Sequence, residues 1–247
     1  NPPKLKLEKA RDVTVSPLQE LPIKATVRDD YGISKAGITY TIEDQPEVTV
    51  DLATDLARNS ESGIDYKLDF EALNAKPDEL LSYYFWAEDV GPDGEVRRTE
   101  GDLFFADVRP FEEIFRQSDG PMQQGGQPGQ QGQQQQAEEL AKLQKQIITA
   151  IWNQIRIEFR GEKPNPDDIQ TIRDSQADAI EQFNEVASRL TDTKSIEIGR
   201  SVFESMKATV DFLDNKDLPE ARSSAQRSFS GLLKLRSREI EVTRQQR

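Results

Sequence analysis

The sequence predicts a two-part fold in which β-strands come first and α-helices follow. Three observations lead to this class. From residue 12 to about residue 108, apolar side chains alternate with polar ones, as in strands with one buried face. Residues 117–136 are rich in glutamine and glycine. Beyond Ala137 the apolar spacing changes to three and four residues, which is the period of an amphipathic helix.

Residues 1–116 are expected to form the strand-rich part. In the stretch LPIKATVRD, Ile23, Ala25 and Val27 fall on one face of a strand, and polar residues fill the other. The same alternation recurs in DVTVS, GITYTIE, EVTVDLA and DYKLDFEAL, and in residues 80–88 and 103–108. About seven short strands within roughly 100 residues are typical of an immunoglobulin-like or fibronectin-like β-sandwich.

Residues 117–136, the glutamine- and glycine-rich segment, are expected to be a flexible linker. The segment has almost no apolar side chain, so burial cannot offset the entropy that would be lost on ordering it. The alternative for such a tract is an aggregation-prone or partner-binding segment.

Residues 137–247 are expected to form four helices, packed as an antiparallel four-helix bundle or as helical hairpins. The stretches GEKPNPDD, TDTKS and DNKDLPEA separate the helices, and Pro219 stands in a first-turn position. Short loops favour antiparallel neighbours, and residues 176–190 also fit the heptad spacing of a coiled coil. We interpret the stripes as the bundle core; the alternative is a face that pairs with helices of another chain. The second stripe comprises Ile169, Ile172, Ile180, Phe183, Val186 and Leu190.

The chain is acidic, with a formal net charge of −13 and a pI of about 4.7. Residues 1–116 hold 14 Lys and Arg against 25 Asp and Glu, a net charge of −11. Residues 222–247 reverse this balance, with seven basic and two acidic residues. The overall charge argues against a nucleic-acid binder, because neutralising phosphates needs clustered Lys and Arg. The basic stretch at the end is suited to an acidic partner.

The residue types exclude most catalytic chemistry. Neither cysteine nor histidine occurs, which removes thiol nucleophiles, Ser-His-Asp triads and nearly every zinc or copper site. The motifs GxSxG, SxxK, GxxxxGK[ST] and HExxH do not occur either. We therefore expect a protein that is not an enzyme. The sequence has no run of 18 apolar residues and begins with Asn1, so we interpret it as a piece of a longer protein whose membrane anchor would lie outside it.

The stretch SYYFWAEDVGPDGE, residues 82–95, contains the first candidate site. In a strand over residues 80–88, Tyr84 and Trp86 would lie on the outer surface of the sheet, opposite a core-facing set. Large rings at such positions commonly cover a neighbouring strand. The alternative is a partner-binding patch, because tyrosine and tryptophan are frequent anchors in interfaces and frequent platforms for sugar rings.

The second candidate site is a group of carboxylates. In an immunoglobulin-like strand order, the loops after the second and sixth strands emerge at the same end. This would bring Asp29 and Asp30 near Glu88, Asp89 and Asp93. Clustered carboxylates suit Ca²⁺, which takes six to eight oxygen ligands, so a calcium site is one hypothesis. The alternative is that these acids are solvated turn residues.

Two parts of the sequence carry a family resemblance. The stretches KATVRDDYGISKAGITYTI and LLSYYFWAEDVGPDG, together with ESMKATVDFLDNKDLPEARSSAQRSFSGLLKL, resemble a bacterial membrane-anchored envelope-protein family of unknown function. In that family, membrane-spanning helices precede a β-sandwich and a Gln-rich helical region. The resemblance implies a periplasmic or otherwise extracytoplasmic place and membrane tethering, and it implies no chemistry. This chain lacks the membrane-spanning segments.

Three functional hypotheses follow. The first is a non-catalytic scaffold or interaction protein with protein partners in a membrane-associated assembly. The second is a carbohydrate-binding accessory module that stacks Tyr84, Trp86 and Tyr31 on sugar rings. The third is a subunit that fills a gap in a larger membrane complex. None of them calls for a cofactor other than the hypothetical Ca²⁺.

Overall fold

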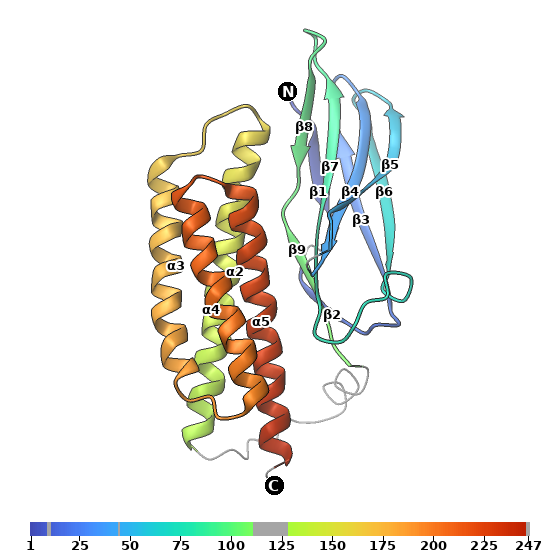
Figure 1. Cartoon of the computed structure of the whole chain (residues 1–247). Helices are drawn as coiled ribbons and strands as arrows, with labels where there is room; N and C mark the ends of the chain where they lie inside the picture. The colour runs from blue at the N-terminus through green and yellow to red at the C-terminus, as the bar shows by residue number, and fades with distance from the viewer. Residues whose placement is uncertain (9–10, 44, 111–127, 246–247) are drawn as a thin grey trace. The chain divides into compact units, whose positions relative to one another are not determined.

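A computed structural model of the chain describes residues 1–8, 11–43, 45–110 and 128–245, with the backbone alone for residues 128–135 and 239–245. The chain divides into two compact units, one made of strands and one made of helices (Figure 1). The mixed β and α class predicted by the change in apolar period is therefore confirmed.

The strand unit contains two sheets. The smaller is antiparallel, in the order β1-β3-β6, and consists of β1 (Lys4–Leu7), β3 (Glu20–Arg28) and β6 (Glu61–Asp69). The larger has the order β2-β9-β7-β4-β5 and consists of β2 (Val13–Val15), β9 (Phe104–Val108), β7 (Leu80–Val90), β4 (Ile33–Ile42) and β5 (Val48–Leu56), with β8 (Val96–Glu100) paired to β7. Its pairs are antiparallel except that of β2 with β9, which is parallel.

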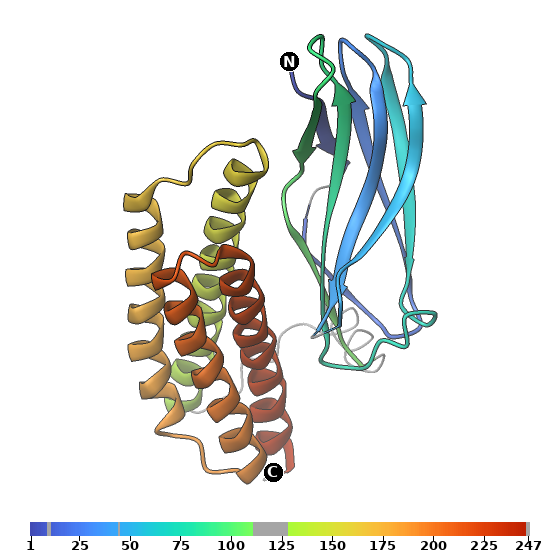
Figure 2. The same cartoon turned by 45° about the horizontal axis from the view of Figure 1, so that its top comes forward.

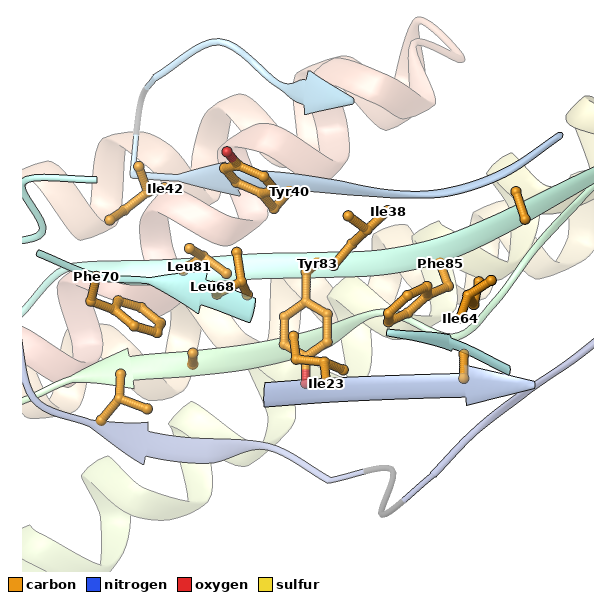
Figure 3. Close-up of a cluster of buried hydrophobic side chains, with 14 of the residues drawn as sticks. Ile23, Ile38, Tyr40, Ile42, Ile64, Leu68, Phe70, Leu81, Tyr83 and Phe85 are labelled. Carbon is orange, nitrogen blue, oxygen red and sulfur yellow. The ribbon is translucent and has the colours of Figure 1, made fainter. Parts of the chain in front are cut away.

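The two sheets share one hydrophobic core (Figure 3). Ile23 and Ile64 enter it from the smaller sheet, and Ile38, Tyr83 and Phe85 enter it from the larger one. Each of these residues is one of an alternating set, because successive side chains of a strand point to opposite faces. The core face predicted for residues 80–88 is confirmed, since every residue of the predicted set is buried in this cluster: Leu81, Tyr83, Phe85 and Ala87.

The structure adds two strands that the apolar alternation did not predict. β1 is a short strand of alternating lysine and leucine that pairs with β3. β8 has the sequence VRRTE, with one apolar residue in five. Between β8 and β9 the chain leaves the ladder at Gly101, whose backbone N–H donates to the Phe85 carbonyl at 2.8 Å. One long strand, β7, therefore pairs with both β8 and β9.

The helical unit contains α2 (Pro128–Phe159), α3 (Pro166–Ala187), α4 (Thr193–Asp214) and α5 (Leu218–Gln245), and successive helices run in opposite directions (Figure 2). The helix starts follow from capping. The Asn165 side chain accepts a hydrogen bond from the Asp167 N–H at 3.1 Å, and Asp192 accepts one from the Ser195 N–H at 3.1 Å. Such caps satisfy backbone donors that have no partner within the helix. Within residues 128–245, no helix has a stretch long and apolar enough to cross a membrane.

The bundle core contains a polar pair among its apolar residues. Gln144 of α2 and Gln176 of α3 are fully buried and exchange two hydrogen bonds of 2.9 and 3.1 Å between their side-chain amides. The predicted second stripe did not include Gln176, because only apolar residues were assigned to the core. A buried amide costs little when its partner satisfies it and costs much when it is alone, so the pair favours one register between the two helices.

The flexible linker expected over residues 117–136 is wrong in its second half. Residues 128–136 belong to α2, and residues 117–127 lie outside the described residues. The physical reason is that glutamine is a good helix former. Once residues 140–155 are held in the bundle, the helix extends backwards through the glutamine run to Pro128, which suits a first helical position.

Candidate functional site

Three loops meet at one end of the strand unit and border a shallow groove. The loops are residues 29–32 after β3, residues 57–60 after β5 and residues 91–95 after β7. The groove has a volume of about 560 Å³. Its lining comes from all three connections: Tyr31, Gly32, Ile33, Ser34, Asp55, Leu56, Ala57, Arg58, Val90, Gly91 and Pro92.

The loop conformations explain why the groove has this shape. Gly32 adopts a φ of 93°, and a Cβ there would lie 2.9 Å from the Leu56 carbonyl oxygen, so only glycine fits. Asn59 adopts a φ of 54°, which asparagine tolerates better than most residues. Its backbone N–H donates to the Asp29 carbonyl at 2.8 Å. The first two loops are thereby held together directly.

A buried ion pair lies behind the third loop. Asp89, the last inward-facing residue of β7, is fully buried. Arg97 of β8 donates from Nε to one oxygen of Asp89 at 3.1 Å and from Nη2 to the other. This two-point geometry matches the planar guanidinium to the carboxylate. The pair holds β8 against β7 at the base of the loop.

Asp29 joins this cluster from the first loop. Its side chain is 5 % exposed and accepts a hydrogen bond from the Tyr31 N–H at 2.7 Å. Burial raises the pKa of the Asp29 carboxyl, and the negative charge of Asp89 adds to this, whereas the hydrogen bond from Tyr31 and the positive charge of Arg97 oppose it. The loop after β3 and the end of β7 thus bring Asp29 and Asp89 together beside Arg97, and the charge of Asp93 in the third loop also acts on this arginine.

The five carboxylates of the calcium hypothesis do not gather in one place. Glu88 points to the opposite face of β7 and pairs with Arg98 at 3.1 Å. Asp30 is exposed and lies 3.6 Å from the amino group of Asn1, and Asp93 accepts a hydrogen bond from the Glu95 N–H within its own turn. Among the described residues, no three acidic side chains are grouped in a way that could hold a metal ion. An arginine, and not a vacant space, lies beside Asp89.

Tyr84 and Trp86 lie on the outer face of the larger sheet, as the alternation predicted, but neither ring is exposed. Their exposed fractions are 4 % and 2 %. The Arg98 guanidinium carbon lies 4.2 Å from the centre of the Trp86 ring, and the Tyr84 hydroxyl donates to Glu47 at 3.4 Å. A partner-binding or sugar-binding role of these two rings stays a prediction.

Gly37 of β4 provides the space that Trp86 occupies. A Cβ at Gly37 would lie 2.5 Å from Cζ2 of the Trp86 ring and 2.3 Å from the Val50 carbonyl oxygen. Gly37 is also the register partner of Trp86. The sequence contains both Gly37 and Trp86, but only the register of β4 with β7 shows that the two residues lie opposite each other.

Three exposed large apolar residues of the strand unit lie at or beside the groove, whereas Leu18 and Val48 lie elsewhere. Tyr31, Val90 and Val96 are 37 %, 44 % and 64 % exposed. Val90 and Val96 are paired across the β7–β8 hairpin, and the Arg97 guanidinium lies 5.6 Å from the Tyr31 ring centre. We call the groove together with Tyr31, Val90 and Val96 the loop-end surface. Sequence reasoning named Tyr31 as a candidate binding residue but missed Val90 and Val96, because β8 was not predicted.

Compared with known protein families and with curated proteins, the sequence gives no match. Among solved structures it is weakly similar to Spo0M, a sporulation control protein from Bacillus subtilis, at 10 % identity and a TM-score of 0.30, over 47 % of this chain and 54 % of that one. It is also weakly similar to pT26-6p, at 9 % identity and a TM-score of 0.24, over 97 % of this chain and 47 % of that one. The chain spans about half the length of each protein, and TM-scores this low assign it to no family.

Proposed function

We propose that the protein is a non-catalytic, extracytoplasmic interaction or scaffold protein of a membrane-associated assembly. The strand unit is its recognition module, and the helical unit is its assembly element. The observation that carries this proposal is the loop-end surface, where three loops surround a groove and present exposed apolar side chains.

The distribution of exposed apolar residues supports a docking role for this end. Single exposed apolar residues are ordinary on protein surfaces, whereas grouped ones mark interaction sites. Seven large apolar residues are exposed in the described part of the chain, and three of them belong to the loop-end surface. A frame held by the Asp89–Arg97 pair presents them, so little ordering entropy is lost when a partner binds.

The strand order supports the finer assignment of an immunoglobulin-like or fibronectin-like sandwich. β3 pairs with β6 in one sheet, and β4, β7 and β9 are neighbours in the other. This matches the B–E and C–F–G pairings of such domains, with β2 running parallel to β9 at the edge. Recognition by the loops at one end is a common use of this architecture.

The extracytoplasmic placement rests on the resemblance of the DDYG and YYFWAED stretches to membrane-anchored envelope proteins. Attachment to a membrane would then be made through a partner or through a segment outside this chain. The absence of histidine and cysteine supports binding as the role rather than catalysis, since carboxylate, lysine, tyrosine and serine chemistry is all that is left.

Site-specific photo-crosslinking tests the proposal. The full chain would carry p-benzoylphenylalanine at Val96 and, in a matched control, at Leu18, which is 69 % exposed in the turn between β2 and β3. After irradiation in cells of the source organism, we expect a discrete crosslinked protein from position 96 and none from position 18. Equal products from both positions, or none from position 96, would contradict a docking role for the loop-end surface.

A further inference from the structure

We propose that the partner of the loop-end surface contributes a basic segment that also carries apolar side chains. This inference rests on the proposed docking function and specifies the chemistry of the occupant. It combines two properties of the same surface, the charges that border the groove and the apolar side chains that form its rim.

The charges at this end are unbalanced toward the acidic side. Asp29 and Asp89 are buried, and Asp89 pairs with Arg97, whose side chain is 28 % exposed. The exposed charges of the groove and the three loops are four carboxylates against one cation: Asp30, Asp55, Asp93, Glu95 and Arg58. The whole strand-rich part adds a net charge of −11 for residues 1–116. Such a surface attracts basic segments and repels acidic ones over about a Debye length.

The apolar side chains give the surface something to bind besides charge. Val90 and Val96 form a cross-strand pair beside the groove, and the Tyr31 ring is held at its edge by Arg97. Apolar and aromatic anchors supply most of the affinity of an interface, and surrounding charges mainly supply association rate and selectivity. A purely polycationic chain would leave these anchors unused, so the occupant needs both residue types.

Arg58 makes the inference sharply testable. It is exposed, it lines the groove, and its Cγ packs beside Gly32. A basic occupant is repelled by this cation. Replacing Arg58 with an acid should therefore strengthen binding, a gain that loss of folding cannot mimic. Lys76 is the matched control, because it is exposed in the loop between β6 and β7 at the opposite end of the strand unit.

The experiment selects a phage-displayed library of random 12-residue peptides on the full chain and measures selected peptides by fluorescence anisotropy. We expect peptides enriched in Lys or Arg together with apolar residues. Their Kd should rise about tenfold in the Tyr31→Ser/Val96→Ser variant. It should fall about threefold in Arg58→Glu and change less than twofold in Lys76→Glu.

The outcomes separate the two proposals. Acidic or uncharged peptides that still depend on Tyr31 and Val96 would overturn the basic occupant and leave the docking function standing. Peptides that ignore Tyr31→Ser/Val96→Ser would show that the loop-end surface is not the docking site. Equal gains in Arg58→Glu and Lys76→Glu would reduce the effect to diffuse attraction by an acidic protein, and failure to select any peptide would also overturn the inference.

Discussion

Two arginines that are neighbours in the sequence lie over two aromatic rings, and the outcomes differ. Arg97 lies 5.6 Å from the centre of the Tyr31 ring, which is 37 % exposed, and Arg98 lies 4.2 Å from the centre of the Trp86 ring, which is 2 % exposed. Successive residues of β8 face opposite sides of the sheet. Arg97 therefore lies on the core-facing side of the sheet, with Asp89 and Tyr31, and Arg98 lies on the outer face, with Trp86.

The acids of β7 divide in the same way. Asp89 is fully buried and pairs with Arg97, whereas Glu88 is partly exposed and pairs with Arg98. Glu88 and Asp89 are adjacent in the sequence, and the calcium hypothesis assigned both to one site. The strand period separates them, and each meets an arginine of the paired strand. The alternation of side chains that predicts the core face thus also places Glu88 and Asp89 on opposite faces, so they do not form one cation site.

The largest expected effect is at the buried ring. Trp86→Ala should lower the free energy of unfolding by about 4 kcal/mol, because it removes a buried indole ring. The cavity left over Gly37 would stay unfilled, since glycine has no side chain. Tyr31→Ala should cost less, about 0.5 kcal/mol, since Tyr31 is 37 % exposed and Trp86 only 2 %. Denaturant unfolding of both variants measures the difference. Equal costs would mean that the two arginine–aromatic pairs play the same role.

The next effect concerns the buried acid. Asp89→Ala should cost about 2 kcal/mol, because Arg97 loses two charge-assisted hydrogen bonds and the frame beneath Tyr31 is released. Thermal unfolding measures the loss. Faster hydrogen exchange of the backbone amides of residues 91–95 should accompany it. A variant as stable as the wild type would show that the pair does not hold the β7–β8 hairpin.

Glu88→Ala should have a smaller effect, below about 1 kcal/mol, because surface ion pairs contribute little. Arg98 also keeps its hydrogen bond of 2.9 Å to Glu100 and its position over Trp86. The same unfolding measurement as for Asp89→Ala provides the comparison. A loss equal to that of Asp89→Ala would contradict the division between a fully buried carboxylate and a partly exposed one.

The smallest effect is a pH dependence at Asp29. Its pKa in the folded protein is raised above the ordinary value of 3.8, so the folded state binds this proton more tightly than the unfolded state. The stabilising contribution is full below pH 3.8 and is lost as the pH rises through the raised pKa. Asp29→Asn keeps an acceptor for the Tyr31 N–H and removes the charge facing Asp89.

The variant Asp29→Asn should therefore unfold at a higher temperature than the wild type near pH 7, and the advantage should shrink below about pH 4. Melting curves across this range give the test, with Asp65→Asn, an exposed acid in the middle of β6, as the control. An advantage that grows on acidification would reverse the sign of the argument.

Sequence patterns predicted the structure correctly where the residues of a single segment determine it. The alternating set of β7 and the helix breaks at GEKPNPDD and TDTKS, where the structure has caps at Asn165 and Asp192, need only local information. Sequence patterns failed where a strand or a buried residue depends on its partner in a neighbouring strand or helix. β8 is polar and exists because β7 extends beyond β9 and offers it a partner. The buried Gln144 was not predicted because its amide is satisfied by residues of other helices, Gln176 of α3 and the Ala225 carbonyl of α5.

By itself, the sequence determined that strands precede helices, which side chains of β7 face the core, and the absence of imidazole and thiol chemistry. Periodicity and composition are properties of single segments, so they can be recognised without knowing which segments pack together. Tertiary structure alone decided that Arg97 neutralises Asp89, that Trp86 fits over Gly37, and that Tyr31, Val90 and Val96 gather at one end. These features depend on strand register and loop geometry, which bring together residues that no sequence period connects.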